Sequence, residues 1–399
     1  MMKHIENSVH CCACGACKDV CRKKAISLCI NSEGYINPVV DESRCIFCGA
    51  CQSVCPCNAP IKTHDEIKSY IAINKNKDLY DYSSSGGVFS AIAASVISNG
   101  GVVFGSAVEY ENNTVQVRHT CVDNLVDLKR IQGSKYVHSQ TEGVFPLVRK
   151  LLEESRTVLF SGTSCQIAAL QSYLKKNYDS LFTVDLVCHG VPEIIRLKEY
   201  ISYLEKKYRC RIEDISFRRK LEPGFYANGE SFIITLKCRD KISGEVRERY
   251  ISKKASAYFL LFLQCVGYRQ NCYSCRYASV NKPADITLGD FRPNRDETEF
   301  FLLSKDKMYS SVLVHTVKGH DLLESISGIK ICGELDLEAM LMHHPRLQTP
   351  SKATKYGLRL FSLYRVAGFR GLQMYIDAEN AVMRLPRKIK KSLKIHNSK

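Results

Sequence analysis

Two cysteine runs near the start of this 399-residue chain have the spacing of iron–sulfur ligands. The first run consists of Cys11, Cys14, Cys17 and Cys21. The second run consists of Cys45, Cys48, Cys51 and Cys55. Both read C-x2-C-x2-C-x3-C, in which one tight loop supplies three thiolates to a [4Fe–4S] cluster and the fourth cysteine binds the other cluster. The spacing therefore predicts two clusters.

This crossed pattern assigns three residues of one run and the last residue of the other run to each cluster. The first cluster would take Cys11, Cys14, Cys17 and Cys55. The second cluster would take Cys45, Cys48, Cys51 and Cys21. The second run repeats the first 34 residues later, although Arg22 stands where the second run has Pro56. Zinc sites usually use two pairs of ligands, so zinc fits these interleaved runs less well. Cys12, Cys29 and Cys57 have no place in the pattern.

Composition favours a cytoplasmic protein of more than one domain. Hydrophobic residues make up 45% of the chain and charged residues 25%, an ordinary balance for a soluble protein. The first ten residues lack the apolar core of a signal peptide. In a reducing cytosol, clustered cysteines indicate metal binding or catalysis rather than disulfides. The apolar stretch 88–108 is interrupted at 99–101 by Asn-Gly-Gly, which predicts a helix, a turn and a strand instead of a membrane span.

The positive charge of the chain is concentrated near its C-terminus. The net charge is +16, and residues 351–399 hold twelve Lys and Arg against two acidic residues. Such a segment could bind nucleic acid, an anionic membrane surface or an acidic protein, and a solvated helical face explains the pattern equally well. A nucleic acid is the least favoured of these partners.

The middle of the chain alternates between short apolar runs and helical patterns, which is typical of α/β layers. We expect strands at 101–109, 157–160 and 182–187, and helices after 166 and over about 193–207. Cys165 and Cys188 each follow a predicted strand, at the strand end where open α/β sheets bind ligands. Cys272 and Cys275 form a further C-x2-C pair. Four cysteines in this pattern fit either a third cluster or a zinc site.

Two small polar loops could bind a phosphate. Serines 83–85 and the following Gly-Gly precede an apolar run, which is typical of a helix N-terminus with free amides. The second loop, 133–137, places Lys135 beside a Gly-Ser turn. A capped helix and a surface lysine without a ligand are the commoner explanations.

These segments together resemble the beta-subunit family of coenzyme F-420 hydrogenases and dehydrogenases, in particular bacterial members with an N-terminal two-cluster ferredoxin domain. The resemblance is carried by SSSGGVFSAI (83–92), IQGSKYVHS (131–139), SGTSCQIAAL (161–170), DLVCHGVP (185–192), NCYSC (271–275) and ADITLGDF (284–291). Two departures are Ser164, where the family usually has Pro, and the lack of a Trp after Phe291.

The resemblance implies FAD in addition to iron–sulfur clusters. It implies that a third [4Fe–4S] cluster is held by Cys165, Cys188, Cys272 and Cys275. It places the flavin contacts at Ser85, Gly86, Gly87, Gly133, Ser134, Lys135, Tyr136, Gly162 and Thr163. His189 could carry a proton, because histidine changes charge near neutral pH, and a structural role is as plausible.

The resemblance also implies a division of the chain. Its parts are a two-cluster ferredoxin-type α+β domain at 1–62, a linker at 63–82, the two halves of an α/β flavin-binding region at 83–165 and 166–334, and a mostly helical basic segment at 335–399.

The expected function is a flavin-dependent iron–sulfur oxidoreductase. Electrons would pass from a ferredoxin or another redox protein through the clusters to FAD, and then to a deazaflavin or another small organic acceptor. The alternative is an electron-transfer subunit without its own catalysis that serves a separate catalytic partner, for example in surface polysaccharide synthesis.

Overall fold

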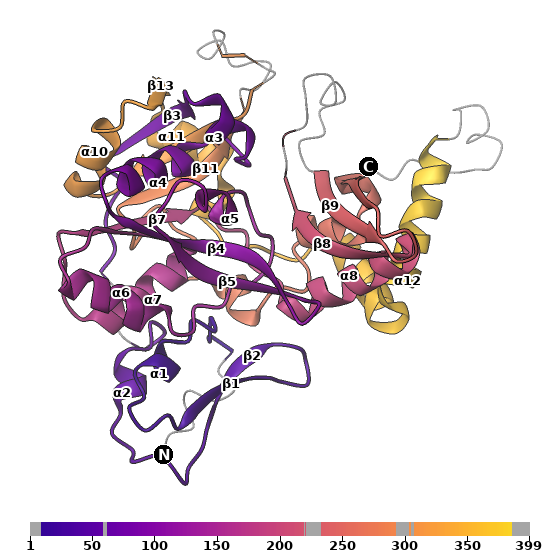
Figure 1. The fold of residues 1–399 in the computed structure, drawn as a ribbon, viewed down its shortest axis with the longest axis horizontal. Coiled ribbons are helices and arrows are strands. Elements are labelled where there is room, and N and C mark those ends of the chain that lie inside the picture. Colours follow the sequence, from indigo (N-terminus) through magenta and orange to yellow (C-terminus); the bar gives the residue numbers. More distant parts are fainter. Residues whose placement is uncertain are drawn as a thin grey trace.

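The computed structural model describes residues 9–58, 62–218, 220, 233–292, 303–304 and 307–384. These residues form a small N-terminal module, a large sheet covered by helices, and a lobe built on a smaller sheet (Figure 1). The N-terminal module lies at the bottom of Figure 1, below α6 and α7, and the lobe lies to the right. The chain is therefore a mixed α/β protein with a helical C-terminal part.

The N-terminal module contains a hairpin and two short helices. The elements are α1 (Ala16–Asp19), β1 (Ile26–Ile30), β2 (Ile36–Val40) and α2 (Ala50–Ser53). The antiparallel pairing of β1 with β2 agrees with the turn and the two short strands that ligand loops of this kind need between them. Each helix starts immediately after a glycine with a positive φ, Gly15 or Gly49, so the repeat seen in the sequence is also a repeat of backbone conformation.

The described strands of the central region form an eight-stranded sheet in the order β13-β3-β12-β11-β7-β6-β4-β5. They are β3 (Lys68–Asn74), β4 (Val102–Glu111), β5 (Thr114–Val122), β6 (Val158–Ser161), β7 (Leu181–Leu186), β11 (Ile286–Phe291), β12 (Tyr309–Val314) and β13 (Ile329–Glu334). The inner strands β4, β6, β7 and β11 run parallel, and the remaining pairs are antiparallel. Parallel strands are short and apolar because both of their faces are buried.

Helices cover both faces of this sheet. The elements that follow or connect its strands are α3 (Lys77–Asp81), α4 (Val88–Ser98), α5 (Leu128–Ile131), α6 (Val144–Glu153), α7 (Ser164–Leu174), α10 (Val317–Glu324) and α11 (Leu337–His343). Apolar side chains of α4 and α5 pack with β3, β4 and β12 in one cluster. Those of α6 and α7 pack with β4 and β6 in another, which also includes Cys12, Cys14 and Ala16 of the N-terminal module. The N-terminal module is thus continuous with the core beneath α6 and α7.

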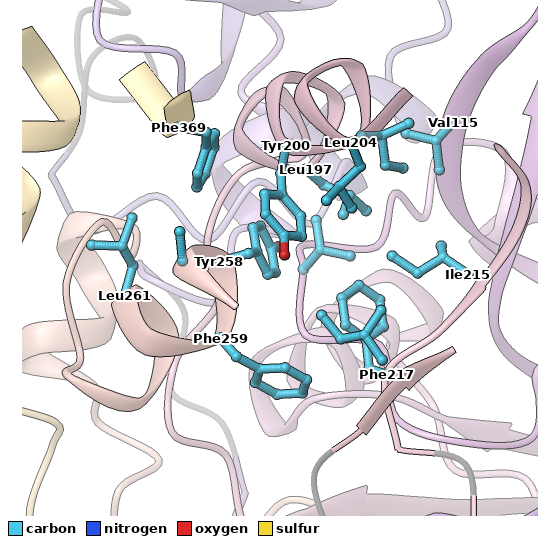
Figure 2. Packing of buried hydrophobic residues seen from close by; sticks show 14 of the residues in the cluster. Val115, Leu197, Tyr200, Leu204, Ile215, Phe217, Tyr258, Phe259, Leu261 and Phe369 are labelled. Atoms are coloured by element: carbon cyan, nitrogen blue, oxygen red, sulfur yellow. The ribbon is translucent and has the colours of Figure 1, made fainter. Parts of the chain in front are cut away.

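The lobe combines a three-stranded sheet, among the described residues, with three helices. Its elements are α8 (Ile194–Tyr208), β8 (Cys210–Ser216), β9 (Ile233–Asp240), β10 (Val246–Ser252), α9 (Ala257–Leu263) and α12 (Lys355–Arg384). Figure 2 shows Tyr200 of α8 at the centre of its core, close to Tyr258 of α9 and Phe369 of α12. The ring centroids of Tyr200 and Phe369 are 5.1 Å apart. Aromatic packing of this kind holds the C-terminal helix to the lobe.

Buried polar contacts fix the first cysteine loop to the rest of the molecule. The guanidinium of Arg269 donates to the carbonyl of Cys11 (3.1 Å) and to that of Ile36 (3.0 Å), and it forms a fully buried ion pair with Glu193. The hydroxyl of Thr141 donates to the carbonyl of Cys14 at 2.6 Å. Because Arg269 and Thr141 belong to distant segments of the body, they fix the first loop, and not the second, against it.

Several sequence predictions are confirmed at the level of elements, and one needs correction. The helix, turn and strand predicted across 88–108 are α4 and β4. The predicted linker at 63–82 instead contains α3 and the strand β3, which lies between β12 and β13 in the large sheet. Because the ends of this segment are polar, its sequence did not indicate a strand, although residues 70–72 at its centre are buried. The predicted boundary at 165/166 falls inside α7, and both predicted halves contribute strands to one sheet.

The C-terminal segment is helical as far as it is described. Helix α12 is interrupted at Gly368, whose φ of 60° and ψ of −169° are not helical. Residues 385–399, which hold half of the basic charge predicted for the tail, lie outside the described residues. Of the described helices, none combines the length and the apolar character needed to cross a membrane.

Replacing Arg269 by Met should destabilise the protein by about 3–5 kcal/mol, because it leaves the buried carboxylate of Glu193 without its partner. Urea unfolding under anaerobic conditions measures the change. The control is Arg239→Met, which removes an exposed ion pair with Glu213 and should cost at most about 1 kcal/mol. Equal losses of unfolding free energy in the two variants would contradict the conclusion that Arg269 holds the first cysteine loop against the rest of the molecule.

Candidate metal centres

The two cysteine loops of the N-terminal module have the same local geometry. The amide of Ala13 donates to the Sγ of Cys11 at 3.3 Å, and the amide of Phe47 donates to the Sγ of Cys45 at 3.4 Å. Ala13 and Phe47 both have a left-handed backbone, with φ of 52° and 54°. Backbone amides directed at sulfur stabilise thiolates and tune the potential of a cluster. Both loops are therefore shaped as thiolate-binding turns.

The predicted ligands of the first cluster surround one pocket. Its lining includes Cys11, Cys14, Cys17 and Cys55, which come from both runs as the crossed pattern requires. Cys12 and Cys57 line the same pocket, although the spacing pattern has no place for them. Burial raises the pKa of Cys11 to about 11, so at neutral pH a metal that binds this thiol must displace its proton.

The predicted ligands of the second cluster lie at the outer end of the module. Cys51 is buried, and it packs against Cys21, which comes from the first run. Burial is the main cause of a raised pKa of Cys51, and the nearby thiols of Cys45 and Cys48 add to it. Cys48 is exposed. Cys21 and Cys45 are half-buried, so this set ranges from a buried thiol to one that is open to solvent.

The four cysteines of the third set converge from three segments. Cys165 lies in the first turn of α7, Cys188 follows β7, and the other two lie on and after a 3₁₀ helix, η2 (Gln270–Ser274). Burial raises the pKa of Cys188 well above its ordinary value, and neighbouring thiols raise it further. Those neighbours are Cys272, Cys165 and Cys275. Residues separated by about a hundred positions therefore meet at the carboxyl ends of β6 and β7.

Local geometry at the third set requires a glycine and supplies hydrogen bonds to sulfur. The amide of Gly190 donates to the Sγ of Cys188 at 3.3 Å. Gly190 has a φ of 116°, and a Cβ atom there would lie 2.4 Å from the ring of Tyr268. The hydroxyl of Thr163 lies 3.1 Å from the Sγ of Cys165. A larger residue than glycine would separate the loop of Cys188 from η2.

Cys12 connects the first set to the third. Its thiol is buried in the packing cluster that also contains Cys14, with Cys165 packed against the same cluster. Its carbonyl accepts a hydrogen bond from the ring of His138 at 3.3 Å. Spacing alone could not identify this role, because Cys12 lies outside the repeated pattern and its partner Cys165 is distant in sequence. The first and third sets are therefore immediate neighbours.

The arrangement of the thiols differs from that of a single-ion site. Among the described residues, no three Cys, His, Asp or Glu side chains meet at the spacing of one metal ion. A [4Fe–4S] cluster is held in another way, because each of its four thiolates binds a different iron atom. Thiols that surround a space, as at the pocket of the first set, fit a cluster of this kind.

The two loops predicted to contact a flavin lie side by side. The hydroxyl of Ser84 accepts a hydrogen bond from the amide of Ser134 at 2.8 Å, which joins segment 83–87 to segment 133–136. The hydroxyl of Ser85 donates to the carbonyl of Tyr309 at 2.6 Å. A Cβ atom on Gly86 would lie 2.4 Å from the backbone nitrogen of Ser310. Gly87 has a left-handed backbone and starts helix α4.

Lys135 turns its amino group inward. This group donates to the carbonyls of Gln132 (2.7 Å) and Arg130 (3.3 Å). Burial lowers the pKa of Lys135 to about 7, and the charge of Asp214 opposes this shift. In the described structure Lys135 therefore binds its own loop.

Three charged residues extend this region. Arg218 forms an ion pair with Asp290 at 2.6 Å and donates to the hydroxyl of Tyr136 at 3.2 Å. Lys220 donates to the carbonyls of Tyr80 and Ser85, and burial lowers the pKa of Lys220 to about 7. Sequence reasoning missed Arg218 and Lys220, because a short run of basic residues after a strand usually indicates a solvated surface.

Three predicted site residues belong to the surroundings of the third cysteine set. Thr163 caps α7 together with Gln166, and Gly162 packs against His119. His189 follows Cys188 directly, its carbonyl accepts a hydrogen bond from Ser351, and Arg346 and Asp290 are its charged neighbours. A role in flavin binding or proton transfer remains a prediction for these residues.

Ser164 has a specific partner in the position where the related proteins usually have Pro. Its hydroxyl donates to the buried carboxylate of Asp185 at 2.5 Å. Thr287 donates to the other oxygen of the same carboxylate at 2.5 Å, and its hydroxyl lies 2.9 Å from the ring of His315. The departure therefore supplies a donor to one oxygen of a buried carboxylate, which a proline could not do.

Comparisons with known proteins match two parts of this chain to family models. Residues 155–338 match the family model that describes the C terminus of the coenzyme F420 hydrogenase/dehydrogenase beta subunit. Residues 38–61 match the 4Fe-4S binding domain. A search of curated proteins gave no match. Among solved structures, one similar chain belongs to the F420-reducing [NiFe] hydrogenase complex from Methanosarcina barkeri, determined with xenon derivatization. The two sequences are 14% identical, the match covers 76% of this chain and 94% of that one, and the TM-score is 0.43.

Replacing Cys188 by Ser should lower the iron content of anaerobically prepared protein from about twelve to about eight atoms per chain, because it removes one ligand of the third cluster. Iron and sulfide assays measure this loss. The matched control is Cys332→Ser on β13, which should keep all of the iron. Wild-type protein that contains eight irons and one zinc would overturn the third cluster.

Replacing Lys135 by Met should reduce the pH dependence of stability above neutral pH. Between about pH 7 and 10.5 the unfolded chain keeps a proton that the folded Lys135 has lost, so the free energy of unfolding rises with pH in this window. Urea unfolding at pH 7 and pH 9 compares the variant with wild type. Lys150→Met, on the exposed face of α6, serves as the control. The same rise in all three proteins would exclude a lowered pKa at Lys135.

Proposed function

We propose that this chain, whose residues 155–338 match the family model of the coenzyme F420 hydrogenase/dehydrogenase beta subunit, is a flavin-dependent iron–sulfur oxidoreductase. In this proposal it accepts electrons from a ferredoxin-type donor and delivers them through FAD to a deazaflavin or another small organic acceptor. The family and the 4Fe-4S binding segment at 38–61 support an oxidoreductase with iron–sulfur centres.

The contact of Cys12 with Cys14 and Cys165 is the observation that carries the proposal. It makes the first and third thiol sets neighbours, while the second set includes the exposed Cys48. Three clusters in this order would lead from solvent to the strand ends of the large sheet. An isolated ferredoxin module would not need its first loop buried against another cysteine site.

The residues present fit the proposed groups in their chemistry. Twelve cysteines in three sets supply the ligands for three clusters, each of which carries one electron at a time. Bound FAD would supply the exchange between single electrons and a hydride. The chain itself would hold the first set in place through Arg269 and Thr141, and would direct amide hydrogens at Cys11, Cys45 and Cys188.

The loops at 83–87 and 133–136 are the proposed flavin site. They lie in contact, one of them starts helix α4, and Lys220 and Arg218 bring positive charge beside them. An anionic group is favoured near helix N-termini and buried cations. Because burial lowers the pKa of Lys135 and Lys220, an anion bound there would return a proton to these amines.

An electron-transfer subunit without its own catalysis is the second candidate. Helix α12 exposes Leu358, Val366 and Met374 to solvent, with Val366 89% exposed. These exposed apolar side chains lie on both parts of the interrupted helix, and surface apolar residues that form one patch mark subunit interfaces. A catalytic partner that co-purifies with the chain, together with no flavin on the chain itself, would favour this candidate.

Anaerobically reconstituted protein should bind one FAD per chain, and Lys135→Met should weaken that binding about tenfold or more, as expected for the loss of a charged hydrogen bond. Flavin fluorescence during titration measures the affinity. Lys150→Met should bind FAD as wild type does. Protein that contains its iron but takes up no flavin would overturn the flavin-dependent proposal.

A further inference from the structure

The two repeats of the N-terminal module bury equivalent loops very differently. In the first repeat, residues 12–16 are buried, and Gly15 faces the backbone of Glu142. In the second repeat, the equivalent residues 46–48 are exposed, and no described atom lies near Gly49. In the first repeat, the loop is packed against the body of the protein. In the second repeat, a loop of the same backbone shape is exposed to solvent.

The exposed loop carries two large apolar side chains next to its cysteines. Ile46 is 61% exposed and Phe47 is 62% exposed. Their equivalents in the first repeat, Cys12 and Ala13, are small and buried. Phe47 also keeps a left-handed backbone, with a φ of 54°, which is costly for a bulky residue. More than half of each of these two side chains is therefore open to solvent.

Cations flank this apolar tip in the segments next to its cysteines. Arg22, Lys23 and Lys24 follow Cys21, Arg44 precedes Cys45, and all four are exposed. A hydrogen bond from the amide of Asp41 to the carbonyl of Ala25, 2.8 Å long, holds the two segments side by side. Two exposed acidic residues, Asp41 and Glu42, lie in the same region. The four cations outnumber them, so the rim beside the apolar centre carries a net positive charge.

We propose that the tip formed by Ile46 and Phe47, with its rim of Arg22, Lys23, Lys24 and Arg44, is the docking surface for an acidic ferredoxin that donates electrons. The inference rests on the proposed function and specifies its donor site. An apolar centre with a charged rim is the usual anatomy of a protein interface, and opposite charges accelerate encounter. Each encounter transfers one electron from the reduced donor to this chain, with no proton or atom transferred, so two encounters supply the pair that a two-electron acceptor needs.

Stopped-flow mixing of the full, anaerobically reconstituted chain with a photoreduced, acidic [2Fe–2S] ferredoxin tests the surface. The readout is the return of the absorbance of the oxidised donor, whose [2Fe–2S] maxima differ from the [4Fe–4S] bands of the chain. The double variant Lys23→Glu with Arg44→Glu should lower the second-order rate at low salt at least about tenfold, and the difference should vanish at high salt. The matched control reverses two exposed lysines of α8, Lys206 and Lys207, and should change the rate less than about twofold.

Phe47→Ser tests the apolar centre independently of charge. It should weaken binding of the oxidised ferredoxin about tenfold or more at moderate salt, as expected for an aromatic residue at the centre of an interface. Iron content and the rate of reduction by dithionite should equal those of wild type in every variant. If Phe47→Ser loses iron, the charge variant, which changes no residue within the loop, still decides the question.

Two results would overturn the docking surface. One is a slower reaction in the α8 variant with no change in the Lys23 and Arg44 variant, which would indicate that the donor docks on the lobe. The other is a dimer of this chain that Phe47→Ser abolishes while donor rates stay the same, which would make the tip a self-interface. Failure of the proposed function is separate, because cluster reduction by the donor needs no flavin.

Discussion

Burial of the first cysteine loop against the body is the constraint on which the rest of the site depends. The loop carbonyls of Cys11, Cys12 and Cys14 accept hydrogen bonds from Arg269, His138 and Thr141. A buried carbonyl without a donor is costly, so each of these contacts both satisfies the loop and fixes its position. The same packing brings Cys12 to Cys165. Loss of these contacts would therefore separate the first thiol set from the third, even though no cysteine ligand had changed.

The clamp also determines the electrostatics of the first set. Arg269 is buried and paired with Glu193, yet its guanidinium lies on the Cys11 carbonyl. Its charge lowers the pKa of Cys11, against the larger effect of burial. A cation close to thiolates favours the more negative oxidation state of a cluster. The second set has exposed cations near it, whose influence water and salt reduce.

Local features of the fold could be predicted from the sequence, and features that depend on distant contacts could not. The ligand loops were predictable because spacing, the glycines and the 34-residue repeat all lie within one short segment. The strands that precede Cys165 and Cys188 were predictable from apolar runs. The family resemblance, which the comparison at 155–338 supports, came from several short motifs in order.

Other features left no local signal. Strand β3 resembles a linker in the sequence, because only its partners β12 and β13 make its polar flanks acceptable in a sheet. The roles of Arg269, Arg218 and Lys220 come from the groups that the fold places around them, and not from their neighbours in the sequence. Cys12 lies outside the spacing pattern. Its role depends on Cys165, which is distant in the sequence and close only in the fold. Pattern reasoning finds residues that act with their sequence neighbours and misses those that act across the fold.

The position of β3 has a consequence for the synthesis of this protein. The strand directly follows the N-terminal module and ends at Asn74, but its neighbours in the sheet start at Tyr309 and Ile329. A nascent chain on the ribosome therefore carries an unpaired apolar strand until most of its length has been translated. Contacts between such distant segments form slowly, and unpaired strand edges promote aggregation. Chaperone occupancy of this segment, and the timing of metal delivery relative to release from the ribosome, would then govern the yield of intact protein.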